Sequence, residues 1–198
     1  MKLRVLLAVA LLTTIGSACS SAVNSEYLKQ AQADALSRVA VKYAEVGQKA
    51  KAEQIFAQAL ESANSIKDDK QSKAYALTQL AKKYVEAGQY DQAFRVVKTI
   101  DPLFDSSKAD ALAKIGDRAT QAEPVARASQ ILAQALEIAK SIEAENLKAE
   151  ALGEIATQYA AIGQAEKASE ILDQALGSAK KVGVTGNLCR LVSCTFPI

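Results

Sequence analysis

The chain has 198 residues, of which 24 are lysine or arginine, 22 are aspartate or glutamate and none is histidine. Its length allows one ordinary domain or one repeat array with a substantial core. The absence of histidine excludes Ser-His-Asp and Cys-His catalysis, histidine-ligated zinc and the Glu-x-x-His di-iron site of helical bundles.

The first 18 residues have the three-part layout of an export signal. Lys2 and Arg4 supply a positive start, residues 5–12 are apolar on every face, and residues 16–18 are small. An amphipathic first helix does not fit a segment without a polar face, and a membrane-spanning helix needs about 20 apolar residues. Residues 1–18 are therefore predicted to be a signal peptide. Its removal leaves 22 basic and 22 acidic residues, and this neutral balance argues against nucleic-acid binding.

The small residues immediately before Cys19 resemble the lipobox of bacterial lipoproteins. The resemblance implies that Cys19 becomes the lipidated first residue of the mature chain, and that residues 19–32 form a linker and the start of the first helix. Gly16 stands where that family usually has Leu, Val or Ile. The alternative is therefore ordinary cleavage after Ala18 or Ala22, which gives a soluble secreted or periplasmic protein. We expect an envelope lipoprotein that is attached to a membrane by its acyl chains alone.

The rest of the chain is an internal repeat. Four similar segments occupy residues 33–67, 74–102, 109–143 and 149–182, with a small residue at Ala52, Ala93, Ala128 and Ala168. Each segment is predicted to form two antiparallel helices. The first helix carries an apolar stripe such as Leu36-Val39-Ala40-Tyr43, and the second carries one such as Ala52-Phe56-Ala59. Between the two helices, Gly47, Gly88 and Gly163 are suited to the left-handed conformation that ends a helix, whereas Pro124 stands in the third segment.

Small residues are expected to face each other inside each helix pair. Side chains no larger than methyl let two helices approach at the close end of the usual range of about 8–10 Å. A single pair cannot cover its own apolar stripe, so neighbouring pairs are expected to stack. The predicted facing residues are Ala40 with Ala52, Ala81 with Ala93, Gly116 with Ala128, and Ala156 with Ala168.

The spacing of Tyr, Gly and Ala in three of the segments resembles the tetratricopeptide repeat (TPR) family: Tyr43-Gly47-Ala52, Tyr84-Gly88-Ala93 and Tyr159-Gly163-Ala168. The resemblance implies an all-α superhelix of about four helix pairs. The chain departs from the family in having no Trp, no proline that closes each repeat, and neither Tyr nor Gly in the third copy. The missing proline predicts second helices that run longer than usual. The alternative is a closed, alanine-rich helical bundle with the same stripes.

In that family the first helices line a concave face that binds peptides or helices of other proteins. The resemblance therefore implies a non-catalytic scaffold with an unidentified protein or peptide partner. Ser37 and Val41 stand where chaperone-binding members carry carboxylate-gripping side chains, which argues against that role. No motif indicates an enzyme, a cofactor or a metal site. The candidate groove residues are Ser37, Val41, Tyr75, Thr78, Lys82, Asp117 and Thr157, and ordinary solvated surface is the alternative for each.

The helical pattern stops at Gly183, so residues 183–198 are predicted to be an irregular tail. An array of this kind usually ends in a helix with a polar outer face, and none is visible in the sequence. We therefore expect an uncovered apolar face on the last repeat, through which copies of the chain could associate. Cys189 and Cys194 could form a disulfide after export.

Overall fold

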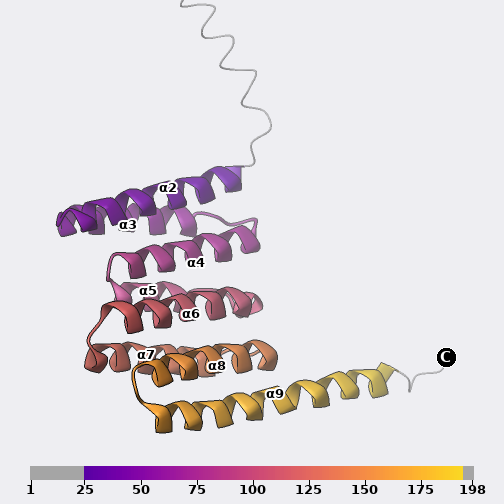
Figure 1. The fold of residues 1–198 in the computed structure, drawn as a ribbon. Coiled ribbons are helices and arrows are strands. Elements are labelled where there is room, and N and C mark those ends of the chain that lie inside the picture. The colour runs from indigo at the N-terminus through magenta and orange to yellow at the C-terminus, as the bar shows by residue number, and fades with distance from the viewer. Residues whose placement is uncertain (1–24, 194–198) are drawn as a thin grey trace, which may run out of the picture.

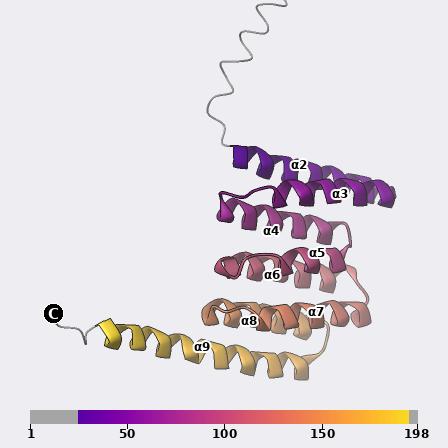
Figure 2. The same cartoon turned by 180° about the vertical axis from the view of Figure 1, so that it is seen from behind.

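The computed structural model describes residues 25–193, and the side chains of residues 25–182, as an open stack of helices (Figure 1). The helices are α2 (Ser25–Glu45), α3 (Lys49–Asn64), α4 (Lys70–Glu86), α5 (Tyr90–Lys98), the short 3-10 helix η1 (Pro102–Phe104), α6 (Asp105–Ala122), α7 (Val125–Lys140), α8 (Glu145–Ala161) and α9 (Ala165–Ser193). The predicted all-α fold is confirmed over this range, which contains no strand. Because the pairs follow one another from α2 to α9, the fold is a linear stack and not a closed bundle (Figures 1 and 2).

The stack has two layers that run along its length. The first helices of the pairs are α2, α4, α6 and α8, and along the stack α2 packs on α4, α4 on α6 and α6 on α8. Each of them also packs on its own second helix, α3, α5, α7 or α9. Figure 2 shows the stack from the side opposite to Figure 1. The connections inside the pairs lie along one edge, which we call the turn edge (residues 46–48, 87–89, 123–124 and 162–164). The connections between pairs lie along the opposite edge, which we call the linking edge (residues 65–69, 99–104 and 141–144) (Figure 1).

Three of the four turns share one backbone geometry. Gly47, Gly88 and Gly163 have φ values of 79°, 73° and 81°. In each turn the N–H of the following glutamine donates to the carbonyl oxygen of the tyrosine five residues earlier, at 2.8–2.9 Å. The glycine N–H donates to the third residue before it, which completes a Schellman motif. The Tyr-x-x-x-Gly-Gln pattern is therefore the sequence form of this turn, and the predicted role of the three glycines is confirmed.

The small residues predicted to lie inside the pairs are buried. Ala40, Ala52, Ala81, Ala93 and Ala128 are inaccessible to solvent. Gly116, Ala156 and Ala168 are also buried, so every predicted pair lies within the core. A Cβ atom built on Gly116 would lie 3.3 Å from Leu132 Cδ2 and 3.2 Å from Gln158 Cγ. The absence of a side chain at Gly116 therefore lets Leu132 of α7 and Gln158 of α8 pack closely against α6.

In two of the four repeats, a buried carboxylate near the start of the first helix accepts hydrogen bonds from the backbone of the linking edge. In the first copy, Glu26 Oε2 accepts a hydrogen bond from the backbone N–H of Lys67 at 3.0 Å. In the third copy, Asp105 Oδ2 accepts from the N–H groups of Glu143 and Ala144 at 2.7 and 3.1 Å. These contacts tie the start of one pair to the segment that leads into the next.

Three expectations about the helices are wrong. The second helices α3 and α7 end at Asn64 and Lys140 after 16 residues each, and do not run on into the segments that follow. After the first of them, Asp69 caps a new helix by accepting a hydrogen bond from the N–H of Ser72 at 2.9 Å. At the end of the chain, α9 continues to Ser193, so helical structure does not end at Gly183.

The third correction concerns Val39, which is 47% exposed although the stripe predicts it to be buried. The matching residues Leu80, Ile115 and Ile155 are buried in pairs that follow another pair, whereas α2 belongs to the first pair of the described residues. At the opposite end of the stack, Leu172 and Leu176 of α9 are each 52% exposed, as expected for an uncovered last repeat. Residues 1–18, Cys19, Cys194 and the side chain of Cys189 lie outside the part that the structure describes, and so do the predictions made for them.

Candidate binding surfaces

Three of the seven predicted groove residues are buried, so their assignment to an open face is wrong. Ser37 is inaccessible to solvent, and Val41 and Thr78 are 5% and 3% exposed. The cause is the close stacking of the first helices, which turns part of each one toward its neighbour. The Thr78 hydroxyl illustrates this, because it donates to the Ala74 carbonyl at 2.8 Å and lies 3.5 Å from the Ser107 carbonyl of α6.

The other four predicted residues are accessible to different degrees on α4, α6 and α8. Tyr75 is 51% exposed, and Thr157 is exposed with its hydroxyl bonded to the Gly153 carbonyl at 3.0 Å. The Lys82 ammonium lies 2.6 Å from an Asp110 carboxylate oxygen, which joins α4 to α6. Asp117 lies 3.7 Å from the Lys114 ammonium on its own helix. Lys82 and Asp117 line one hollow, whereas Tyr75 and Thr157 do not.

The hollow defines what we call the first-helix face. It has a volume of about 330 Å³ and is lined by Lys82, Asp110, Ala113, Lys114, Asp117, Glu154 and Gln158. A second hollow of about 230 Å³ shares part of this wall and is lined by Ser106, Ala109, Asp110, Ala113, Leu147, Glu150, Ala151 and Glu154. Alanines form part of the lining, and four carboxylates outnumber two lysines. Such a face admits the close approach of a helix and favours basic side chains on it.

Glu150 and Glu154 of α8 differ from the other two carboxylates on this face. Asp110 and Asp117 each have a lysine within 4.0 Å. Within the described part of the chain, neither glutamate has a lysine or arginine nitrogen that close, and both are exposed. The two glutamates therefore keep a negative charge available for an incoming cation.

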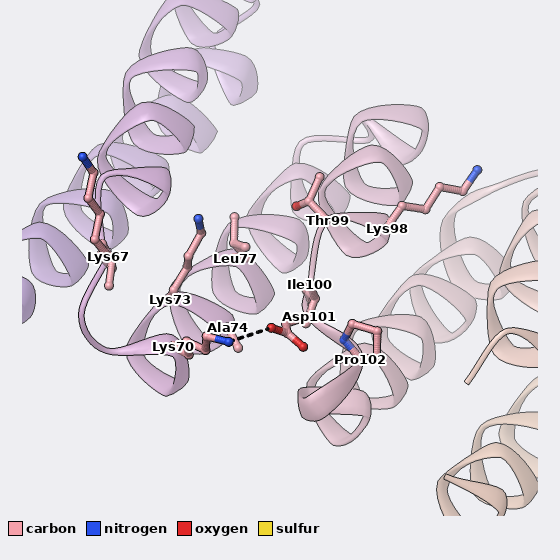
Figure 3. A pocket seen from close by; sticks show the side chains of 11 residues that line it. Lys67, Lys70, Lys73, Ala74, Leu77, Lys98, Thr99, Ile100, Asp101 and Pro102 are labelled. Carbon is pink, nitrogen blue, oxygen red and sulfur yellow. Dashed lines mark ion pairs between the residues drawn. The ribbon is translucent and has the colours of Figure 1, made fainter. Parts of the chain in front are cut away.

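A larger cavity than the two hollows of the first-helix face lies on the linking edge, and the sequence analysis did not predict it. It has a volume of about 630 Å³ and lies among the α3–α4 connection, the start of α4 and the end of α5 (Figure 3). We call it the basic pocket because four lysines but one carboxylate line it. Its lining residues are Ile66, Lys67, Lys70, Lys73, Ala74, Leu77, Lys98, Thr99, Ile100, Asp101 and Pro102.

The charges of the basic pocket are only partly paired. The Lys70 ammonium lies 3.6 Å from an Asp101 oxygen, and it points toward that residue in Figure 3. Lys67 and Lys73 extend in a common direction, whereas Lys98 extends away from them (Figure 3). None of these three has a carboxylate within 4.0 Å among the described residues. The pocket therefore presents an excess of positive charge above an apolar floor.

The nearby Asp69 carries a negative charge beside the pocket, and its side chain caps α4. Its carboxylate accepts hydrogen bonds from the Ser72 hydroxyl at 2.7 Å and from the Ser72 N–H. These bonds hold the pKa of Asp69 below its usual value. The carboxylate thus stays ionised at the helix start, which is the place where a negative charge stabilises a helix.

Three further observations concern the chemistry of the described residues. No group of three or more His, Cys, Asp or Glu side chains in that part of the chain is arranged to hold a metal ion. None of the helices α2–α9 combines the length and the apolar character needed to cross a bilayer. Comparison with known proteins finds no family model, no curated protein and no solved structure that matches the chain.

Proposed function

We propose that the protein is a non-catalytic interaction scaffold that binds a peptide or helix of a partner protein on the first-helix face. The observation that carries the proposal is the pair of exposed glutamates, Glu150 and Glu154, beside an alanine-lined hollow. A partner helix with small residues toward α6 and α8, and a lysine or arginine above the two glutamates, fits this combination of shape and charge. No cofactor is required for such a role.

The spacing of Tyr, Gly and Ala supports assignment of the array to the TPR class. The positive φ of the Schellman turn explains why glycine recurs, and burial explains why the following alanine recurs, whereas tyrosine and glutamine take part in the turn through backbone groups. In this proposal the buried Ser37, Val41 and Thr78 space the first helices. Partner contact belongs instead to exposed groups of α4, α6 and α8.

We further propose that Cys19 is lipidated and holds the array on a membrane of a bacterial cell envelope. The support is the layout of residues 1–18 and the small residues before Cys19. A Cys19→Ala variant tests the anchor by cell fractionation. Its release into the soluble fraction is the expected result, and retention with the membranes would contradict lipid anchoring.

Site-specific photo-crosslinking tests the binding face. A photoreactive amino acid at Thr157, on α8, is expected to crosslink the partner protein. The double variant Glu150→Lys with Glu154→Lys is expected to lose binding of the same partner. The same photoreactive residue at Gln54, exposed on α3, is the positional control. Glu53→Lys together with Glu61→Lys, both exposed on α3, is the matched charge control. Equal capture at both positions, or equal loss with both charge variants, would contradict the proposal.

A second candidate function is self-assembly through the end of the stack. Leu172 and Leu176 lie one helical turn apart on α9, and each is 52% exposed. A second copy that covered them would continue the stack as a neighbouring pair does. Light scattering of the protein and of Leu172→Glu together with Leu176→Glu separates the two functions. A monomer in both cases rules out self-assembly, whereas an oligomer that the variant abolishes favours it.

A further inference from the structure

We propose that the linking edge faces the membrane and that the basic pocket binds the phosphate of an anionic phospholipid. The proposal rests on the proposed lipid anchor at Cys19 for its orientation. It adds a specific ligand-binding site and fixes which edge of the stack meets the lipid surface.

The first argument is the place where the chain enters the array. Ser25 begins α2 at the linking edge (Figure 1). The start of this helix is bonded to the segment that forms the pocket wall. Glu26 accepts from the Lys67 N–H at 3.0 Å, and the Lys29 ammonium donates to the Ser65 carbonyl at 3.0 Å. Residues 19–24 span at most about 20 Å when fully extended, so an acylated Cys19 holds this edge close to the headgroups.

The second argument is that the pocket has a lysine where the third and fourth copies of the repeat have a carboxylate. Asp105 and Glu145 lie eleven residues before the small residues Gly116 and Ala156 of their first helices. Each pairs with the lysine three residues later, Asp105 with Lys108 at 3.2 Å and Glu145 with Lys148 at 3.4 Å.

In the second copy the position equivalent to Asp105 and Glu145 is Lys70, eleven residues before Ala81. Lys73 therefore lacks the partner that its equivalents have, and Lys70 reaches across to Asp101 instead. Lys67 and Lys98 add two further cations to the same cavity. The first copy also has a lysine at this position, Lys29, so the excess of positive charge distinguishes the second copy from the third and fourth copies.

The third argument is the set of exposed apolar side chains on the same edge. Tyr27 and Leu28, near the start of α2, are 60% and 55% exposed, and Leu103 of η1 is 77% exposed. Tyrosine is favoured at the boundary between headgroups and acyl chains, and leucine side chains are stabilised when they enter the acyl region. Tyr27 and Leu28 lie near the start of α2 and Leu103 lies in η1, so the linking edge carries exposed apolar side chains as well as the lysines of the pocket.

The chemistry of the pocket fits a phosphate that is attached to an apolar body. Lysine ammonium groups bind phosphate as point charges, and Lys67, Lys70 and Lys73 line one wall. Ile66, Leu77 and Ile100 also line the pocket, although each is almost fully buried. An anionic phospholipid presents a phosphate next to glycerol and acyl carbons, and it is concentrated in the plane in which the anchor would lie.

Vesicle binding by the unanchored chain tests this proposal separately from the anchor. The chain of residues 20–198 lacks Cys19 but keeps every described helix and the whole core, which extends from Ala33 to Ala175. We expect it to partition onto phosphatidylglycerol-containing vesicles more than onto pure phosphatidylcholine vesicles. Lys67→Gln together with Lys73→Gln is expected to weaken this partitioning about 30-fold at low salt. Lys49→Gln together with Lys51→Gln, on the turn edge, is the matched control and is expected to have little effect.

Each other result overturns the proposal in a distinct way. Equal losses with both double variants would show that general charge, not the pocket, attracts the vesicles. Equal binding to both vesicle types would exclude a preference for anionic headgroups. Competition by millimolar inorganic phosphate would identify a free anion as the ligand, and tighter binding to a glutamate-rich peptide would identify an acidic protein segment. Circular dichroism of each variant establishes that the helices are retained. The anchor is judged by Cys19→Ala fractionation alone, so either proposal can fail without the other.

Discussion

The two edges of the stack differ in how regular their connections are. On the turn edge, three of the four connections have the same length, the same glycine conformation and the same pair of hydrogen bonds. On the linking edge, no two connections are alike. Residues 65–69 lead to a helix capped by Asp69, residues 99–104 contain η1, and residues 141–144 are tied to Asp105.

This difference shows where the array has freedom to acquire a binding site. The turn edge fixes the antiparallel crossing inside each pair, so its residues recur. The linking edge only connects one helix pair to the next, so its side chains can differ from repeat to repeat. The basic pocket occurs there, at the connection between the first and second copies and beside the end of α5.

The largest expected effect is at the linking edge, at Asp105. The Asp105→Ala change removes an acceptor from two backbone N–H groups and leaves the Lys108 ammonium in a site where that residue is 7% exposed. Breaking a buried pair of this kind is expected to lower the free energy of unfolding by about 3 kcal/mol. Urea unfolding provides the measurement. Asp91→Ala, at an exposed carboxylate beside the turn edge, is the control and is expected to cost less than about 0.5 kcal/mol. Similar values for the two variants would refute the role of Asp105.

The next effect concerns the contacts inside the pairs, which the turn edge aligns. Ala81 and Ala93 are both inaccessible to solvent in α4 and α5. An Ala81→Leu change is expected to lower the free energy of unfolding by about 2 kcal/mol, because the helices must separate to admit the larger side chain. Ala57→Leu on the exposed side of α3 is the control. An unchanged urea midpoint for Ala81→Leu would show that α4 and α5 do not meet through small residues.

A smaller effect is expected at the turn edge from Gly88→Ala. The backbone at Gly88 has a φ of 73°, and a Cβ there would meet no atom within 4 Å. The expected loss of about 1 kcal/mol therefore comes from the left-handed conformation and not from a clash. Gly153→Ala in α8 also has open space, and it is expected to stabilise the helix by up to about 1 kcal/mol. Changes of the same sign in the two variants would contradict the assigned turn.

The smallest effect is a pH dependence at Glu26 on the linking edge. Hydrogen bonds from the Lys29 ammonium and the Lys67 N–H hold the pKa of Glu26 below its usual value of 4.5, although burial opposes this. A carboxylate with a lowered pKa stabilises the folded state above the unfolded pKa, and this contribution is lost as the pH falls through the folded pKa. Glu26→Gln is therefore expected to lose less stability than the parent between pH 7 and pH 3. Thermal unfolding at several pH values, with Glu53→Gln as the control, measures the difference. Parallel curves for Glu26→Gln and the parent would exclude the effect.

The sequence predicts the turn edge well and the linking edge poorly, for a physical reason. Tyr84, Gly88 and Ala93 lie close together in the chain, and a local hydrogen-bond pattern fixes their spacing. The pocket combines residues 66–77 with residues 98–102, which are brought together only by the packing of α4 on α5. Taken alone, the lysines of the first segment look like a solvated helix end.

Errors on the first-helix face and at the end of the stack have a related cause. Ser37 and Thr78 are polar, yet the neighbouring first helix covers them. Val39 is apolar, yet no preceding pair of the described residues covers it. Helix periodicity predicts which residues share a face, but it does not predict which neighbour, if any, covers that face.

Lysine footprinting by chemical acetylation and mass spectrometry tests the difference between the two edges most directly. The chain of residues 20–198 is acetylated alone and again with phosphatidylglycerol-containing vesicles, and the reaction rate is measured at each lysine. The account predicts that Lys67 and Lys73 become protected by vesicles, whereas Lys49 and Lys51 on the turn edge react as before. Equal protection at both edges, or protection of Lys49 and Lys51 alone, would contradict it.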